Sequence, residues 1–357
     1  MKRARSLMTC RVISAEDLRG WVGRILENGP VMGPVERKGQ PGFYRFDDLI
    51  RPEDLVLNYT TTTLPPKKAF FPPEETVFRF ADGDPPKLSP VRGTPPRVLL
   101  GVHPCDLSAI DALDRAYSHP PPDRRWQHNR SRTILVGVDC VPDAYCFCES
   151  LGVAQARRPC DLFLTEIERG YLVEIHTPAG ADLLAEARTA DARGQDFLEA
   201  EHRRRQKTLA IQSRLKASPD RLADFLEAGD FREIWEGIAS RCYGCGSCNT
   251  TCPTCFCFTM DDEFDWDLKS GVRWRAWDSC QLMDFGLVAG GHRFRGERWE
   301  RVRHRWHRKF LYLYRRFGRA FCTGCGRCSR ACTADINIVD ETNRIIDAAT
   351  GGEAHAE

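Results

Sequence analysis

The sequence predicts an α+β protein, with a mixed α/β N-terminal half and a mainly helical C-terminal half. Two short apolar runs, residues 98–102 and 133–138, have the composition of strands that are buried on both faces of a parallel sheet. The segment between them has helical spacing, and Asp106 is its expected N-cap. Strand, helix and strand together form a βαβ unit, which places an α/β domain in the first half of the chain.

The remaining elements follow from local patterns. Residues 15–26 have helical spacing, and two further strands are expected at residues 162–167 and 171–175, joined by a turn that contains Gly170. From residue 183 to about 240 the chain is charged, alanine-rich and helical in pattern. We therefore expect an N-terminal domain over residues 1–185, a helical connector over 186–240, a cysteine-rich domain over 241–345 and a flexible tail over 346–357.

Composition excludes several classes of protein. Lys and Arg total 52 against 50 Asp and Glu, so the formal net charge of +2 gives no overall attraction to nucleic acid or to anionic membranes. The longest apolar runs are far shorter than the roughly 20 residues of a spanning helix, so no membrane insertion is expected. The basic N-terminus is not followed by a continuous apolar region, so we expect an unprocessed chain without a signal peptide.

The seventeen cysteines are better explained as thiolate ligands than as disulfides, because their number is odd and the chain has no recognisable export signal. Eight of them form two runs with the spacing CxxCxxCxxxC. The first run consists of Cys242, Cys245, Cys248 and Cys252. The second run consists of Cys322, Cys325, Cys328 and Cys332.

This spacing is typical of proteins that bind two 4Fe-4S clusters, in which the fourth cysteine of each run binds the other cluster. We therefore predict a two-cluster, ferredoxin-like domain with crossed ligands. The ligands expected for cluster 1 are Cys242, Cys245, Cys248 and Cys332. The ligands expected for cluster 2 are Cys322, Cys325, Cys328 and Cys252. Iron bound through these cysteines is the expected metal.

All four thiolate positions of each cluster are filled, so we expect electron relay and no catalytic residue. The glycines that adjoin the ligands relieve backbone crowding and let amide N–H groups point at the cluster sulfurs. Zinc also binds CxxC pairs, but a zinc site would leave half of each run unexplained. The cluster interpretation is therefore favoured over zinc.

A long insert, residues 253–321, separates the two runs. Its apolar residues from Trp299 to Phe317 are spaced by three and four, which predicts a long amphipathic helix. Between Arg293 and Arg330 there are thirteen Lys or Arg and only two Glu. Binding of nucleic acid is one explanation, but a solvated face, or a counter-charge to anionic clusters and an acidic partner, is favoured. His304 and His307 are expected to be surface residues.

Four upstream cysteines form a second candidate site, since Cys105 and Cys140 follow the two predicted parallel strands at the same sheet edge. The helix that starts beside Cys105 favours its thiolate form. Cys146 and Cys148 follow in the next loop, so the four thiols could bind a third iron-sulfur cluster. Their irregular spacing leaves open the alternative of buried thiols or a redox-active pair. Cys255, Cys257 and Cys280 are expected to fill the core.

Several segments, taken in order, resemble a known family. They are residues 64–68 (LPPKK), 71–75 (FPPEE), 101–106 (GVHPCD), 146–150 (CFCES) and the two cysteine runs. Between residues 30 and 340 the chain resembles the iron-sulfur β subunit of cytoplasmic sulfhydrogenase-type nickel-iron hydrogenases and the related A subunit of anaerobic sulfite reductase. The resemblance implies a cytoplasmic, non-catalytic subunit that relays electrons between a partner holding FAD and NAD(P) and a partner holding the catalytic metal centre.

Two other functions compete with this one. A self-contained reductase would need its own flavin, but the chain has no GxGxxG or P-loop pattern, so no dinucleotide site has support in the sequence. An iron-sulfur protein that binds nucleic acid would have to use the basic insert, whose aromatic residues fall on one helical stripe and are better explained as core. An electron-transfer subunit is therefore the expected function.

Overall fold

A computed structural model describes residues 10–91 and 93–353, and its N-terminal half is built on an eight-stranded sheet. The strand order is β10-β1-β9-β8-β7-β6-β2-β3, and the central strands β2, β6, β7 and β8 run parallel. The strands are β1 (Cys10–Ile13), β2 (Val31–Glu36), β3 (Tyr44–Asp48), β6 (Arg97–Val102), β7 (Thr133–Val138), β8 (Leu162–Ile167), β9 (Gly170–Ile175) and β10 (Ala190–Asp191). The two apolar runs are therefore parallel neighbours, and the β8–β9 hairpin is antiparallel, as expected.

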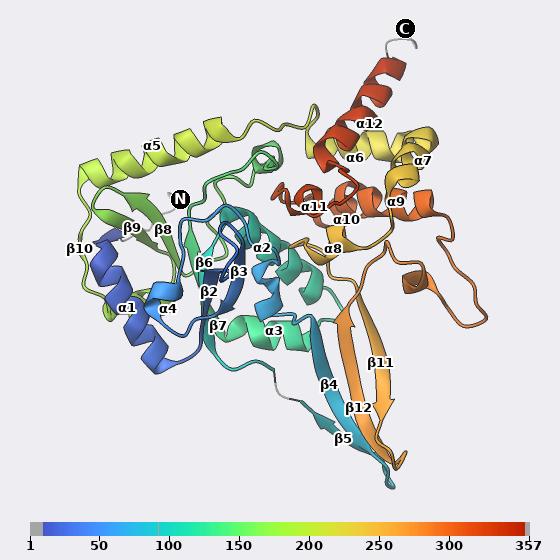
Figure 1. Cartoon of the computed structure of the whole chain (residues 1–357), viewed down its shortest axis with the longest axis horizontal. Helices are drawn as coiled ribbons and strands as arrows, with labels where there is room; N and C mark the ends of the chain where they lie inside the picture. Colours follow the sequence, from blue (N-terminus) through green and yellow to red (C-terminus); the bar gives the residue numbers. More distant parts are fainter. Residues whose placement is uncertain (1–9, 92, 354–357) are drawn as a thin grey trace, which may run out of the picture.

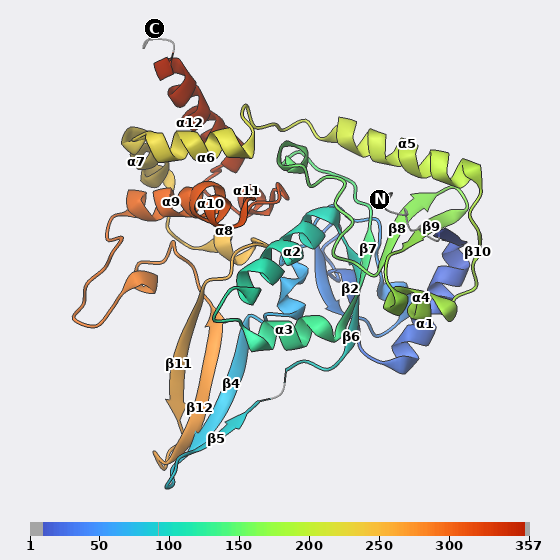
Figure 2. The same cartoon turned by 180° about the vertical axis from the view of Figure 1, so that it is seen from behind.

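Five helices accompany this sheet, as Figures 1 and 2 show from opposite sides. They are α1 (Ala15–Asn28), α2 (Pro104–Ser118), α3 (Arg124–Ser131), α4 (Pro178–Ala185) and α5 (Gly194–Ala210). The expected N-cap of α2 is wrong: the helix begins at Pro104, because the fixed φ of proline suits the first helical position. Asp106 lies within the first turn of α2, and its carboxylate binds an arginine of the C-terminal half.

A second, four-stranded sheet has the order β11-β12-β4-β5 and is antiparallel throughout. Its strands are β4 (Glu74–Ala81), β5 (Lys87–Pro90), β11 (Phe258–Phe264) and β12 (Ser270–Trp277). The two strands in the insert of residues 253–321 were not predicted from the sequence, nor was a sheet that joins both halves of the chain. Figures 1 and 2 show this sheet projecting as an arm from the rest of the molecule.

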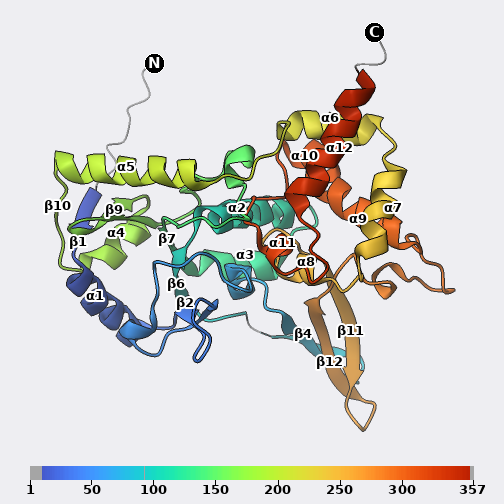
Figure 3. The same ribbon diagram turned by 45° about the horizontal axis from the view of Figure 1, so that its top comes forward.

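The C-terminal half is mainly helical, as expected. Its helices are α6 (Pro219–Ala228), α7 (Arg232–Arg241), α8 (Ser247–Thr250), α9 (Arg298–His307), α10 (Leu313–Phe317), α11 (Arg327–Arg330) and α12 (Ile338–Glu353). A π-helical segment, Arg308–Tyr312, joins α9 to α10, so the predicted long helix of the insert is continuous through this segment. Its apolar stripe, including Trp306 and Phe310, packs with Trp235 of α7 in one core. Figure 3 shows these helices grouped around α9 and α10.

The C-terminal tail differs from the expectation in the part that the structure describes. Residues 346–353, assigned to a flexible tail, continue α12, and residues 354–357 lie outside the described chain. The physical reason is that Ile345 and Ile346 are buried in the core formed with Trp235 and Trp306. Burial of apolar side chains stabilises a helix end that local composition leaves undecided.

The two halves share apolar contacts as well as a sheet. Phe147, from the loop that follows β7, is fully buried in the core of the C-terminal helices. Ala112 of α2 packs with Leu313 and Phe321 in a smaller cluster. Among the helices that the structure describes, none combines the length and the apolar character needed to cross a membrane.

Candidate iron-sulfur centres

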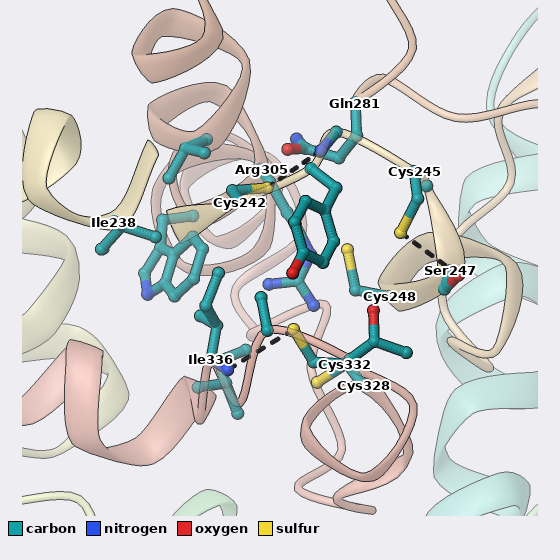
Figure 4. A pocket seen from close by; sticks show the side chains of 18 residues that line it. Ile238, Cys242, Cys245, Ser247, Cys248, Gln281, Arg305, Cys328, Cys332 and Ile336 are labelled. Atoms are coloured by element: carbon teal, nitrogen blue, oxygen red, sulfur yellow. Dashed lines mark hydrogen bonds between the residues drawn. The ribbon is translucent and has the colours of Figure 1, made fainter. Parts of the chain in front are cut away.

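Three cysteines of the first run, Cys242, Cys245 and Cys248, line a cavity beside α9 together with Cys328 and Cys332 of the second run (Figure 4). Cys242 caps the C-terminus of α7, and Cys248 lies in the short helix α8. Cys332 lies two residues after the end of α11 and faces the same space. Cys245 is the most exposed cysteine of this cavity. It is the only exposed cysteine among the described residues.

The surroundings of this cavity fit a 4Fe-4S cluster. Apolar side chains, including Val302, Trp306 and Ile338, form much of the wall. The backbone N–H of Gly244 points at Cys242 Sγ at 3.3 Å, and that of Ile336 points at Cys332 Sγ at 3.4 Å. Amide hydrogen bonds to sulfur stabilise thiolate charge and help to set the cluster potential. Four thiols, amide donors and apolar walls are the environment that such a cluster requires.

The second set of thiols is enclosed. Burial raises the pKa of Cys322 to about 12 and that of Cys325 to about 11, and the nearby Cys252 and Cys328 act on both thiols. Cys252 is buried, and its sulfur accepts a hydrogen bond from Lys309 Nζ at 3.1 Å. The structure thus brings Cys252 to the second run and Cys332 to the first. The crossed assignment of ligands to clusters 1 and 2 remains a prediction that agrees with this arrangement.

The two sets adjoin each other. Cys328 belongs by sequence to the second run, yet it also lines the cavity of the first run. It interacts electrostatically with Cys248 from the first run and with Cys325 from the second. This adjacency of the two sets of thiols suits transfer of an electron between two clusters.

The upstream cysteines converge at the carboxyl edge of the eight-stranded sheet. Cys105 lies in the first turn of α2, Cys140 follows β7, and Cys148 begins a short 3₁₀ turn. Cys140 interacts electrostatically with Cys148 and with Cys105, and Cys146 interacts with both Cys148 and Cys140. The four thiols therefore form one group, whose role as a third cluster site remains a prediction.

Protonation in this upstream group is dominated by burial. Burial raises the pKa of Cys140 to about 12 and that of Cys148 to about 11. Burial also raises the pKa of Cys105 well above its ordinary value, with a further contribution from the charge of Asp106. The place of Cys105 at a helix N-terminus was expected to favour its thiolate, whereas burial acts in the opposite direction by raising its pKa.

Within residues 10–91 and 93–353, no three His, Cys, Asp or Glu side chains are placed to hold a single metal ion. The cysteines of a cubane each bind a different iron, so they surround a larger space than the ligands of one ion do.

The upstream loop packs directly on the second cysteine run. The backbone N–H of Phe147 donates to Gly324 O at 2.9 Å. A Cβ added to Gly324, which has φ +66°, would lie 2.5 Å from Cys148 Cα, so only glycine fits at this contact. The upstream thiols also lie near the second run, because Cys325 interacts electrostatically with both Cys105 and Cys146.

A buried ion pair fastens the second run to the N-terminal half. The guanidinium of Arg327 binds both carboxylate oxygens of Asp106 at 2.7 and 2.8 Å, and its Nε donates to Thr62 O at 2.9 Å. Arg327 is 2% exposed and the Asp106 side chain is fully buried. This pair was not predicted from the sequence, in which Asp106 was expected only to cap the helix beside Cys105.

The basic insert is only partly a solvated face. Arg301, Arg305 and Lys309 are buried, and Arg301 donates to Gln281 O at 3.1 Å. His307 is also buried, so its expected place on the surface is wrong; it packs in edge contact with Trp235. Of the explanations left open, a counter-charge to the clusters agrees best with Arg305 and Lys309, because both lie beside cluster cysteines.

Of the three cysteines expected to fill the core, Cys280 is buried and Cys255 and Cys257 are half-buried, and all three have polar neighbours. Cys255, Cys257 and Cys280 line a small cavity with Arg305, Lys309 and other residues. Asn249 Nδ2 lies 3.1 Å from Cys280 Sγ, and Asn249 Oδ1 lies 3.6 Å from Cys255 Sγ. Most of these contacts were missed because Arg305 and Lys309 lie far from the three cysteines in the sequence, and Asn249 reaches Cys280 across 31 residues.

Comparison with known proteins agrees with this arrangement. A family model for the 4Fe-4S dicluster domain matches residues 241–336. The chain is 36% identical over 318 residues to sulfhydrogenase 2 subunit beta of Pyrococcus furiosus, an alignment that covers 88% of this chain and 92% of that protein. No solved structure matches the chain. The resemblance inferred from the motifs is thus confirmed: this chain carries a 4Fe-4S dicluster domain and belongs to the family of sulfhydrogenase β subunits.

Proposed function

We propose that this chain is the iron-sulfur subunit of a multi-subunit oxidoreductase. In this proposal it relays single electrons between a subunit that binds flavin and NAD(P) and a catalytic metal subunit of the hydrogenase or sulfite/sulfur reductase type. The observation that carries the proposal is the adjacency of two sets of four thiols, which Cys328 links by lining one cavity and belonging to the other run. With every thiolate position used, neither set leaves an iron open to substrate.

The residues of the chain have defined tasks in this relay. A bound 4Fe-4S cluster would supply reversible uptake of one electron at each site. Amide donors such as Gly244 N–H stabilise the negative charge of the thiolates. Apolar side chains such as Trp306 shield the first site from water. The exposed Cys245 marks the face at which cluster 1 would exchange electrons with a partner, whereas the second set has no exposed cysteine and its Cys252 is buried. A cytoplasmic location goes with this proposal, because the enzymes that the chain resembles are cytoplasmic.

A third iron-sulfur cluster at Cys105, Cys140, Cys146 and Cys148 would extend the relay toward the sheet edge. The observations that support it are the convergence of four buried thiols and their nearness to Cys325. Iron quantitation tests it: about twelve irons per anaerobically purified chain are expected, against about eight for the dicluster domain alone.

The matched comparison for the third cluster uses Cys140→Ser and Cys160→Ser. Cys160 is also buried, but it packs in the core of the eight-stranded sheet. If the third cluster exists, Cys140→Ser lowers the iron content by about four per chain and Cys160→Ser leaves it unchanged. An iron content near eight in the wild type, unaffected by either variant, would eliminate the third cluster.

The relay itself is tested in the assembled complex. Replacement of Cys325 by serine is expected to abolish electron flow from NAD(P)H to the catalytic subunit, while each partner keeps its half-reaction with artificial dyes. Cys160→Ser serves again as the control and should leave the full reaction intact. Full physiological turnover in both Cys245→Ser and Cys325→Ser would contradict the relay. Flavin absorbance retained on the isolated chain after cluster removal would instead identify a self-contained reductase.

A further inference from the structure

Three cations are buried around residues 249–255, the segment that carries Cys252, the last cysteine of the first run. Lys67, Arg305 and Lys309 are 3%, 4% and 4% exposed. Among the residues that the structure describes, none of the three pairs with a carboxylate, whereas the equally buried Arg327 is fully paired with Asp106. Burying an unpaired charge is strongly unfavourable, so these cations require another source of negative charge.

Among the residues that the structure describes, the only acidic groups in contact with Lys309 are cysteine thiols. Its ammonium lies 3.1 Å from Cys252 Sγ and 3.4 Å from Cys255 Sγ. Its other contacts are neutral oxygens, Thr254 Oγ1 at 3.5 Å and Phe321 O at 3.4 Å. Lys309 therefore makes a charge-assisted contact with a sulfur that we assign as a ligand of cluster 2.

The other two cations have less direct contacts. Lys67 Nζ donates to the backbone oxygens of Cys252 and Cys255 and lies over the Trp277 ring, 4.2 Å from its centroid. Arg305 Nε donates to Asn249 Oδ1 at 3.2 Å, while its Nη2 has no hydrogen-bond partner among the described residues. Both add positive charge to the region, but of these three cations only Lys309 donates directly to an assigned ligand sulfur.

We propose that Lys309 is a positioning residue that raises the reduction potential of cluster 2 through its contact with Cys252 Sγ. A four-thiolate cluster is anionic in both redox states and gains one more negative charge on reduction. A buried ammonium at hydrogen-bond distance from a ligand sulfur stabilises the reduced state more than the oxidised state. The inference rests on the proposed relay and on the assignment of Cys252 to cluster 2.

The chain offers a matched set of variants on one helical segment. Lys309→Met removes the charge while keeping a long side chain, and Lys309→Arg keeps the charge. Arg303→Met removes a charge from the exposed face of α9, where solvent and salt screen it. The measurement is an anaerobic redox titration of the cluster-loaded chain, followed by electron paramagnetic resonance, with iron quantitation on every sample.

In Lys309→Met we expect the reduced-to-oxidised ratio of one cluster to fall about tenfold at the wild-type midpoint potential. For a one-electron couple this equals a shift of about 59 mV to lower potential. The other dicluster signal should move much less, Lys309→Arg should restore most of the shift, and Arg303→Met should titrate like the wild type.

Three outcomes would overturn this proposal. The first is a wild-type titration in Lys309→Met at full iron content. The second is a shift of the same size in Arg303→Met. The third is loss of iron in both Lys309→Met and Lys309→Arg, which would give Lys309 a purely structural role. Failure of the relay is distinguishable, because it would appear as a wild-type chain without two redox-active clusters or as unimpaired turnover in Cys325→Ser.

Discussion

The two cysteine runs have identical spacing but different surroundings. In the first run Cys245 is exposed, and a Cβ added to Gly244 would meet only Gln281 O, at an ordinary 3.5 Å. In the second run the matching Gly324 is pressed against the backbone of Phe147 and Cys148. Spacing therefore specifies what a run can bind, while its neighbours decide whether the bound cluster is near the surface or inside the molecule.

The same contrast appears one residue before the third cysteine of each run. Ser247 occupies this position in the first run, where its Oγ lies 3.4 Å from the sulfur of Cys245. In the second run the position holds Arg327, which is buried against Asp106 and Thr62. The second run is fastened to the N-terminal half by a buried charge pair, whereas the first run is joined to it by the hydrogen bond from Lys67 to Cys252 O.

The largest expected effect comes from breaking that pair. Arg327→Met leaves the Asp106 carboxylate buried without its partner, and such a change costs about 3–5 kcal/mol of folding free energy. We expect a lower midpoint in anaerobic urea unfolding of the cluster-loaded chain. The exposed Arg315, which pairs with Asp224 and Glu227, supplies a control whose replacement by methionine should leave the midpoint unchanged. Equal midpoints for Arg327→Met and the wild type would show that the fastening is dispensable.

The next effect compares the matched glycines. Both have positive φ, so an alanine at either position costs about 1–2 kcal/mol from backbone strain. Gly324→Ala adds a clash with rigid backbone at Cys148, of about 1–3 kcal/mol, which Gly244→Ala avoids. In urea unfolding, Gly324→Ala should therefore be the less stable of the two variants. The reverse order would mean that the contact with the upstream loop is not maintained.

A smaller, kinetic effect should distinguish the exposed site from the enclosed one. Because Cys245 is exposed and Cys252 is buried, a chelator added under mild oxidation should remove cluster 1 first. Alkylation followed by peptide mass spectrometry should then detect modified Cys245 before modified Cys325. Simultaneous modification of the two runs would indicate that the whole domain opens at once and that exposure does not control cluster loss.

The smallest effect is expected at Ser247. Within the part of the chain that the structure describes, its hydroxyl makes only the weak contact with Cys245. Ser247→Ala should change the free energy of unfolding by no more than about 0.5 kcal/mol. A loss comparable to that of Arg327→Met would show that both runs depend equally on this position.

The strands of the parallel sheet were predictable because their signal is local. Nearly continuous apolar composition over residues 98–102 and 133–138 is enough to indicate buried strands, and the helix between them follows from its own spacing. The arm was not predictable in this way. Its central contact pairs β12 with β4 across most of the chain, and no local pattern specifies such a partner.

At the cluster sites, the sequence by itself determined which cysteines form two matched runs, because ligand spacing reflects the fixed geometry of a cluster. The dicluster domain confirmed over residues 241–336 contains both runs.

Tertiary structure alone decided the charge environment of these sites. A helix rich in arginine and lysine looks solvated in sequence, yet Arg305 and Lys309 are buried beside cysteines, and Arg327 is buried against Asp106. The physical reason is that the burial of a charge depends on a partner that can come from any part of the chain. Whether that partner is a carboxylate or a thiolate is settled only when the distant segments have packed together.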